Sequence, residues 1–207
     1  MIRGRTLDAF LTDLAARRPA PGGGATAAVH AAQAAALVGM VARYSDGARF
    51  AEHAEEIARI VAASDRLWAE SLRLAEADAA AFSAVTDAYA LPRATDEEKA
   101  ERTLAMAAAL QEACEPPVAV IAAAAEAVAL AERVLPIGNR NVVTDVAAAA
   151  EAARAAATTA RVNVEINLGG IRDPRAREEF REAARAVDPV VERAEKVTAA
   201  VREAIAV

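Results

Sequence analysis

The sequence predicts an all-α protein, an up-and-down bundle of about five or six long antiparallel helices forming one domain over residues 1–207. Alanine dominates a composition that is 55% hydrophobic, and only 3% of the residues are aromatic. Alanine is the best helix former, whereas strands favour β-branched and aromatic residues. Long segments without Gly or Pro also carry apolar residues at helical spacing. Alanine buries little area, so such helices must pack closely, which also favours a broad interface with a second copy of the chain.

Charge and cysteine content narrow the classes of partner. The net charge of −6, without a basic cluster, argues against nucleic acid as a main partner.

The apolar run 25–42 is about as long as a membrane span, but it is mainly Ala and Gly and carries His30 and Gln33. We therefore expect a buried bundle helix and no membrane partner. An amphipathic segment follows residues 1–5 where a signal peptide would have an apolar core, so we expect a cytoplasmic protein. The single cysteine, Cys114, excludes an intrachain disulfide. The sequence contains no CxxC or HExxH pattern, so it carries no zinc-site signature.

The first predicted helix is short. Thr6 is a good N-cap, and Leu7, Phe10, Leu11 and Leu14 follow at the spacing of one apolar face. Pro19 ends this segment, residues 19–24 form a loop, and a second helix is expected over about 25–44.

Three glycines, Gly22, Gly23 and Gly24, precede the second helix. Glycine adopts backbone angles closed to other residues and allows a ligand or a helix to approach the main chain. Free N–H groups at the positive end of a helix dipole suit an anion or a polar ligand edge. A tight turn explains the same glycines equally well.

Residues 48–91 contain neither Gly nor Pro, which predicts one very long helix ending at Pro92. Its inward line repeats with nearly heptad spacing: Ile57, Ile60, Val61, Ser64, Leu67, Trp68, Ser71, Ala75, Asp78, Phe82, Val85 and Tyr89. Asp78 therefore lies on an apolar line. An Asp in that position is either solvated after all, or paired, hydrogen-bonded or functional.

A fourth helix should begin at the capping box 95–98, with a break near Glu115 imposed by Pro116 and Pro117. Cys114 is interpreted as a small core residue rather than a nucleophile. In the loop 135–141, Gly138 and Asn139 tolerate left-handed angles, and Asn141 or Thr144 is expected to cap the next helix.

Asp145 falls in the first turn of the fifth helix, where stabilisation of the helix dipole would account for it. That helix should end near Val162, leaving Asn163 and Asn167 in a turn. The last helix should begin at Asp173-Pro174 and be kinked or divided by Pro189.

Four separated segments then resemble one family, the cyclodeaminase/cyclohydrolase family of tetrahydrofolate enzymes. It includes the cyclodeaminase domain of formiminotransferase-cyclodeaminase and stand-alone methenyltetrahydrofolate cyclohydrolases. The matching segments are 10–15 leading to Pro21-Gly22-Gly23-Gly24, then 78–85 with Leu91-Pro92, then 138–145, and finally 163–168. Their order and spacing agree over nearly the whole chain.

The resemblance implies a helical bundle like the cyclodeaminase domain, a homodimer, and a folate site between helices with no tightly bound cofactor and no metal. It implies one of two reactions: closure of 5-formiminotetrahydrofolate to the 5,10-methenyl compound with loss of ammonia, or interconversion of the methenyl compound and 10-formyltetrahydrofolate. Both need a proton shuttle at the carbon between N5 and N10.

In that light Asp78 is the candidate general acid/base, and Asp145 would stabilise the cationic carbon or share the proton transfer. The candidate substrate-binding residues are Gly22, Gly23, Gly24, Thr26, Asn139, Arg140, Asn141 and Asn163. Arg140, Arg49 or Arg43 would meet the carboxylates of the folate glutamate.

The chain departs from the family pattern at Ala25, His30, Gln33 and Phe50, and Phe50 lies where relatives carry a Lys-Lys-Tyr stretch. Those departures leave a second hypothesis open, a catalytically inactive or re-purposed helical dimer that binds a small ligand or a protein partner. His30 is interpreted as structural rather than catalytic. Convergence of Asp78 and Asp145 with the three glycines on one pocket would favour the enzyme.

Overall fold

The protein is an elongated helical bundle, seen here in a computed structural model that describes residues 2–206; Met1, the first residue of the N-terminal segment discussed above, lies outside it. Within that range the structure contains eight α-helices and no strand. They are α1 (Leu7–Ala15), α2 (Gly23–Arg43), α3 (Ala54–Ala90), α4 (Asp96–Glu112), α5 (Glu115–Val134), α6 (Val143–Leu168), α7 (Pro174–Arg185) and α8 (Val187–Ile205). Short 3-10 helices precede α3 (Ala48–His53) and α6 (Arg140–Val142).

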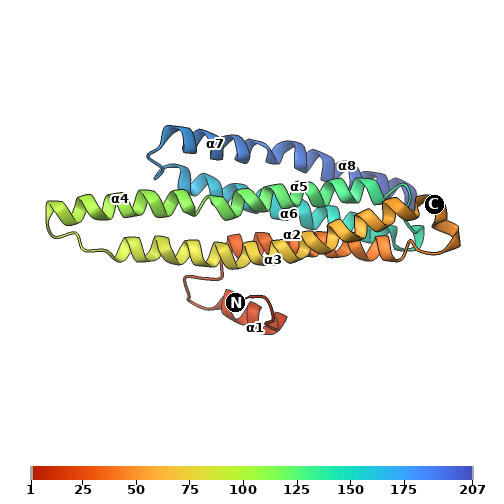
Figure 1. Cartoon of the computed structure of the whole chain (residues 1–207), viewed down its shortest axis with the longest axis horizontal. Coiled ribbons are helices and arrows are strands. Elements are labelled where there is room, and N and C mark those ends of the chain that lie inside the picture. Colours follow the sequence, from red (N-terminus) through yellow and green to blue (C-terminus); the bar gives the residue numbers. More distant parts are fainter. Residues whose placement is uncertain (1, 207) are drawn as a thin grey trace.

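The eight helices form six rods, because α4 continues into α5 and α7 continues into α8 (Figure 1). The all-α prediction of five or six antiparallel helices is therefore confirmed. The α7–α8 rod lies along one side of the bundle, α2 and α3 along the other, and the ends of α3 and α4 project together beyond the remaining helices.

Helix α2 forms the centre of the core and packs against α3, α5 and α6. Its contact face is built from fully buried small residues such as Ala28, Ala31 and Ala35. Small side chains let helix backbones approach closely, so many weak contacts accumulate along the helix length. By length and composition alone α2 and the stretch Asp96–Val134 are apolar enough to cross a membrane, but 61% and 56% of their apolar windows are buried in the bundle.

Side-chain caps and prolines set most helix ends where the sequence placed them. The Thr6 hydroxyl accepts a hydrogen bond from the Ala9 N–H, and Thr95 and Glu98 form a capping box. Prolines 116 and 117 occupy the first turn of α5, Asp173 caps α7, and α8 begins two residues before Pro189. Proline fits the first turn because its missing N–H has no partner there.

Two predictions about helix termini are wrong. Asn163 and Asn167 do not lie in a turn: α6 continues to Leu168, and both side-chain amides donate to carbonyls one helical turn earlier, those of Thr159 and Asn163. Neither Asn141 nor Thr144 caps α6, whose N-cap is Val142; Asn139 caps the preceding 3-10 helix by accepting a hydrogen bond from the Asn141 N–H.

Gly138 tolerates left-handed backbone angles, but the structure does not use them there. The only positive φ values among the described residues belong to Gly4 and Gly47. Gly138 is instead needed for close packing, since a Cβ there would lie 2.7 Å from the Val134 carbonyl oxygen.

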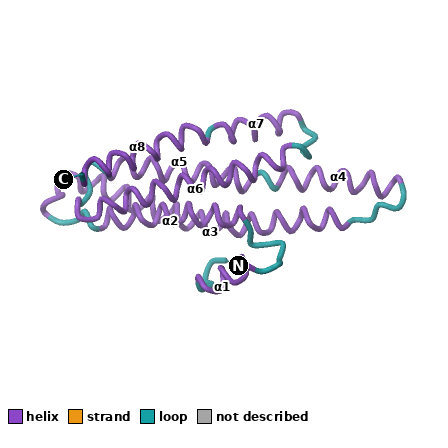
Figure 2. The backbone as a smooth tube through the Cα atoms, turned by 180° about the vertical axis from the view of Figure 1, so that it is seen from behind, coloured by secondary structure: helices purple, strands orange, loops and turns teal. Residues whose placement is uncertain are grey.

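Helix α1 stands apart from the bundle (Figure 2). Phe10 is buried, but Leu7 and Leu11 are 67% and 50% exposed, so the apolar face predicted for this helix is only partly covered. The inward line of α3 is also wrong at its far end, where Phe82 and Tyr89 are exposed to solvent.

Candidate active site

Asp78 lies on α3 directly against the first turn of α2. A Cβ atom added to Gly24 would lie 1.9 Å from Asp78 Oδ1 and 2.4 Å from Asp78 Cγ. Real Cβ atoms do not approach other atoms so closely, so the carboxyl group occupies space that only glycine leaves open. Gly24 and Asp78, 54 positions apart in the sequence, therefore form one site.

The glycines act through close approach rather than through unusual backbone angles. None of them has a positive φ, and the helix begins two residues earlier than expected, with Gly22 as the N-cap and Gly23 and Gly24 in the first turn. Their N–H groups lie at the positive end of the α2 dipole. Thr26 also belongs to this turn, where its hydroxyl donates to the Gly22 carbonyl at 2.9 Å.

Burial raises the pKa of the Asp78 carboxyl above its ordinary value of 3.8, because the charged form loses its hydration. The Ala25 backbone N–H opposes this rise by favouring the charged form, and burial is the larger effect. A carboxyl group with a raised pKa, half-buried in a cleft, is suited to accept and return a proton.

A cleft of about 460 Å³ opens beside Asp78. Helix α3 provides one wall with Phe82, Val85 and Tyr89, and α4 and α6 provide the opposite one. Phe82 and Tyr89 are 48% and 58% exposed, so two aromatic faces line an open slot beside a single carboxylate. The shape and the apolar walls suit a flat heterocycle.

Asn163 brings α6 into the same cleft. A Cβ atom added to Gly23 would lie 3.8 Å from Asn163 Nδ2. The same Nδ2 donates a hydrogen bond to the Thr159 carbonyl at 2.8 Å. Asn167 lies one turn further on and also lines the cleft. Expected site residues Gly23, Gly24, Asp78 and Asn163 thus meet, whereas Asn167, Ile166 and Leu110 were not recognised from the sequence as site residues.

The remaining expected site residues lie elsewhere. Asp145 is in the first turn of α6, 18 residues before Asn163, which places them roughly 27 Å apart along the helix. Asn139 donates through its side chain to the Tyr44 carbonyl at 2.9 Å, and Arg140 donates to the Ala204 carbonyl at 3.2 Å. Asn141 is exposed on the same loop. Within one chain Asp145 therefore does not share a pocket with Asp78.

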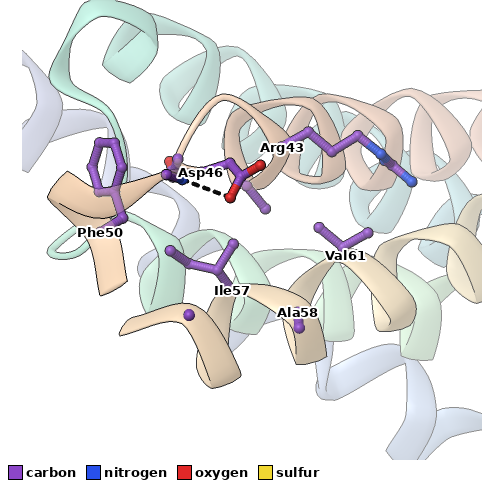
Figure 3. Close-up of a pocket in the computed structure, with 10 residues that line it drawn as sticks. Arg43, Asp46, Phe50, Ile57, Ala58 and Val61 are labelled. Carbon is purple, nitrogen blue, oxygen red and sulfur yellow. Dashed lines mark hydrogen bonds between the residues drawn. The ribbon is translucent and has the colours of Figure 1, made fainter. Parts of the chain in front are cut away.

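A second hollow of about 340 Å³ lies near this loop, between the end of α2 and the start of α3 (Figure 3). Its polar groups already have partners: Arg43 pairs with Asp65 at 2.6 Å, and Asp46 accepts a hydrogen bond from the Gly47 N–H. Phe50 lines the hollow, with Arg49 over its ring at 5.7 Å. The arginines expected to bind a glutamate tail are thus distant from Asp78.

Two other expectations are settled by the contacts. Cys114 is fully buried, and burial raises the pKa of its thiol to about 11, so it is a core residue and not a nucleophile. His30 and Gln33 share a face of α2, as their spacing required, and His30 Nδ1 lies 3.2 Å from Gln33 Oε1.

The family model described as formiminotransferase-cyclodeaminase matches residues 6–186 of the chain. The chain belongs to the formiminotransferase-cyclodeaminase family.

Curated members of the formiminotransferase-cyclodeaminase family fall into two kinds. A protein of Methylorubrum extorquens named methenyltetrahydrofolate cyclohydrolase is 37% identical over 174 residues, which are 84% of either chain. The formimidoyltransferase-cyclodeaminases of Rattus norvegicus and Sus scrofa are 33% and 38% identical, over 85% and 82% of this chain. This chain spans only about a third of their length, 33% and 31%.

The fold of the family is also present in a solved structure. The crystal structure of formiminotetrahydrofolate cyclodeaminase from Thermotoga maritima superimposes with a TM-score of 0.84 at 29% identity, covering 97% of this chain and 99% of that one. The bundle resembles the cyclodeaminase fold over its whole length, as the sequence predicted.

Proposed function

We propose that this protein is a folate-dependent one-carbon enzyme that works at the carbon bridging N5 and N10 of tetrahydrofolate. The observation that carries the proposal is the Asp78 carboxyl, packed on Gly24 at the edge of an aromatic-walled cleft. The family relationship supports the substrate class. The substrate is a tetrahydrofolate derivative, and the proposal includes no tightly bound cofactor.

In the cyclohydrolase direction, a water molecule attacks the bridging carbon of the methenyl cation while the Asp78 carboxylate accepts a proton from that water. The bond between the tetrahedral carbon and N5 then breaks as Asp78 returns the proton to N5, and the hydroxyl on that carbon releases its remaining proton to water as the formyl C=O forms. The products are 10-formyltetrahydrofolate and one proton, so atoms and charge balance. A carboxyl group with a raised pKa performs both transfers better than an ordinary one near neutral pH.

In the cyclodeaminase direction, N10 attacks the formimino carbon, the N10 proton passes to the imino nitrogen, and ammonia then leaves from the tetrahedral carbon to give the methenyl cation. Neutral Asp78 would donate a proton to the leaving nitrogen. The relative of matching length with 37% identity favours the cyclohydrolase, and the structural match at 29% identity keeps the cyclodeaminase as the second candidate.

Binding follows from the cleft. The benzoyl ring of the substrate would stack on Phe82, and Asn163 with the N–H groups of Gly22–Gly24 would meet the polar edge of the pterin. Thr26 holds the turn by donating to the Gly22 carbonyl, and its hydroxyl oxygen can still accept a hydrogen bond from the ligand. The relatives are named as enzymes, which disfavours the rival hypothesis of an inactive or re-purposed dimer.

The proposal places the protein in the cytoplasm as a homodimer. The exposed Leu7 and Leu11 of α1, a helix that stands apart from the bundle, support a second copy as the surface that covers them. Asn139, Arg140, Asn141 and Asp145 have no assigned step within one chain, and light scattering on purified protein would measure the oligomeric state.

The deciding experiment follows the absorbance band of 5,10-methenyltetrahydrofolate with purified protein, beside a run that begins from 5-formiminotetrahydrofolate. Loss of the band faster than the blank identifies a cyclohydrolase. Growth of the band from the formimino compound identifies a cyclodeaminase. Neither change, with protein that melts cooperatively, would overturn the proposal.

A further inference from the structure

We infer that Arg102 is the residue that binds the glutamate carboxylate of the folate substrate, at the outer end of the cleft. This inference rests on the proposed function. Arg102 replaces Arg43, Arg49 and Arg140 as the expected glutamate-binding residue. Arg43 and Arg49 lie at the hollow between the end of α2 and the start of α3, and Arg140 lies in the 3-10 helix before α6.

The cleft has a direction. Asp78 and Tyr89 both line it and lie 11 residues apart on α3, a rise of roughly 16 Å. On α4, Leu110 lines the inner part and Arg102 lies eight residues earlier, about 12 Å further out. A folate whose bridging carbon lies at Asp78 and whose pterin lies at the inner end therefore extends its benzoyl group and glutamate toward Tyr89 and Arg102.

Tyr89 joins the cleft wall to Arg102. The guanidinium carbon of Arg102 lies 5.6 Å from the centre of the Tyr89 ring, and its Nε and Nη2 both donate to the Tyr89 carbonyl at 3.2 Å. These contacts fix the guanidinium against Tyr89, a residue of the cleft wall, and they leave the Nη1 donors available, because arginine has five N–H groups. A fixed guanidinium suits a carboxylate better than a mobile ammonium.

The neighbouring acidic residues do not neutralise Arg102. Glu98 lies one turn before it, at the spacing of a helical ion pair, but its Oε2 accepts hydrogen bonds from the Ala94 and Thr95 N–H groups in the capping box. Asp96 pairs with Lys99. Among residues 2–206, no carboxylate forms a salt bridge with Arg102, so its charge remains for a ligand.

The test compares two substrates, 5,10-methenyltetrahydrofolate and the corresponding tetrahydropteroate in the form of its neutral methylamide, which has no glutamate and no carboxylate; this second substrate is called the pteroate below. Arg102→Gln removes the charge but keeps a side-chain donor for the Tyr89 carbonyl. We expect this variant to raise KM for the folate about tenfold, the usual effect of one charge-assisted hydrogen bond, with kcat little changed. KM for the pteroate should not change.

Arg93→Gln, at an exposed position of the same hairpin, is the matched control, because the contacts with Tyr89 of the cleft wall are made by Arg102; it should leave both KM values unchanged. Arg102→Lys, which keeps the charge without the planar fork, should fall between the wild type and Arg102→Gln. The wild type alone gives a further test, since the KM advantage of the folate over the pteroate should shrink as NaCl is raised.

An equal rise of KM for both substrates, or none for the folate, would overturn the assignment of Arg102. A wild-type enzyme that acts on both substrates without preferring the folate overturns it as well. Failure of the wild type on both substrates is a different result, because it removes the proposed function itself.

Discussion

The carboxyl group of Asp78 lies in the space that a side chain on Gly24 would fill, with a Cβ at that position only 1.9 Å from Asp78 Oδ1. One residue thus supplies the candidate proton carrier, and the other supplies room for it. This pairing explains why a glycine occupies a helical turn, where alanine is intrinsically more stable by about 1 kcal/mol.

Gly24→Ala is expected to push the Asp78 carboxyl out of its position. We expect kcat to fall by about 100-fold, since displacement by an ångström has effects of that order on a positioned catalytic group. Gly22→Ala keeps the backbone N–H and adds a Cβ that meets nothing within 4 Å, so kcat should fall far less in this comparison variant. Equal activity of the two variants, both with cooperative melting, would contradict the pairing.

Asp78→Asn tests the proton transfer directly. Loss of a general acid/base lowers kcat by about 10²–10⁴-fold, while the nearly equal volume of asparagine preserves the packing. Asp87→Asn, on an exposed position of the same helix, should leave kcat unchanged. If Asp78→Asn retained full turnover with an intact fold, Asp78 would not be the proton carrier.

The same substitution gives a stability signature with a defined sign. The pKa of Asp78 is raised in the folded state, so its contribution to stability is fully present below the unfolded value of 3.8 and is lost as pH rises through the folded pKa. The melting temperature of Asp78→Asn relative to wild type should therefore increase over that interval and then level off. A difference that is constant with pH from 3.8 upward would contradict the raised pKa.

Helix positions in this protein were predictable from local chemistry, because caps and prolines at Thr6, Thr95, Pro116 and Asp173 fix helix ends without help from tertiary contacts. Asp78 stood out because it interrupts an apolar line. The errors arose where tertiary context decides. Asn163 continues a helix, and Phe82 and Tyr89 keep the apolar spacing of α3 beyond the start of α2, where a cleft replaces the core.

Cys114 should be chemically silent in the folded protein. Burial raises the pKa of its thiol to about 11, and the side chain is fully covered. A thiol reagent at pH 8 should label it very slowly in buffer and at once in guanidinium chloride, because the thiolate is the reactive form. Labelling in buffer at the rate of a free thiol would show that the break between α4 and α5 opens readily.

Phe82 is expected to contribute to binding rather than to stability. Its ring is 48% exposed and lines the cleft, so Phe82→Ala removes a stacking surface for the benzoyl ring of the substrate while giving up little buried area. We expect KM to rise about tenfold, since stacking of an aromatic pair plus the lost contact area amounts to about 1–2 kcal/mol. Leu104→Ala, at an exposed position of α4 outside the cleft lining, is the control for removing a large apolar side chain from the surface. Unfolding in urea should give nearly the same midpoint for both variants. A large loss of stability in Phe82→Ala with unchanged KM would contradict this prediction and would show that Phe82 is a core residue, as its helical spacing predicted.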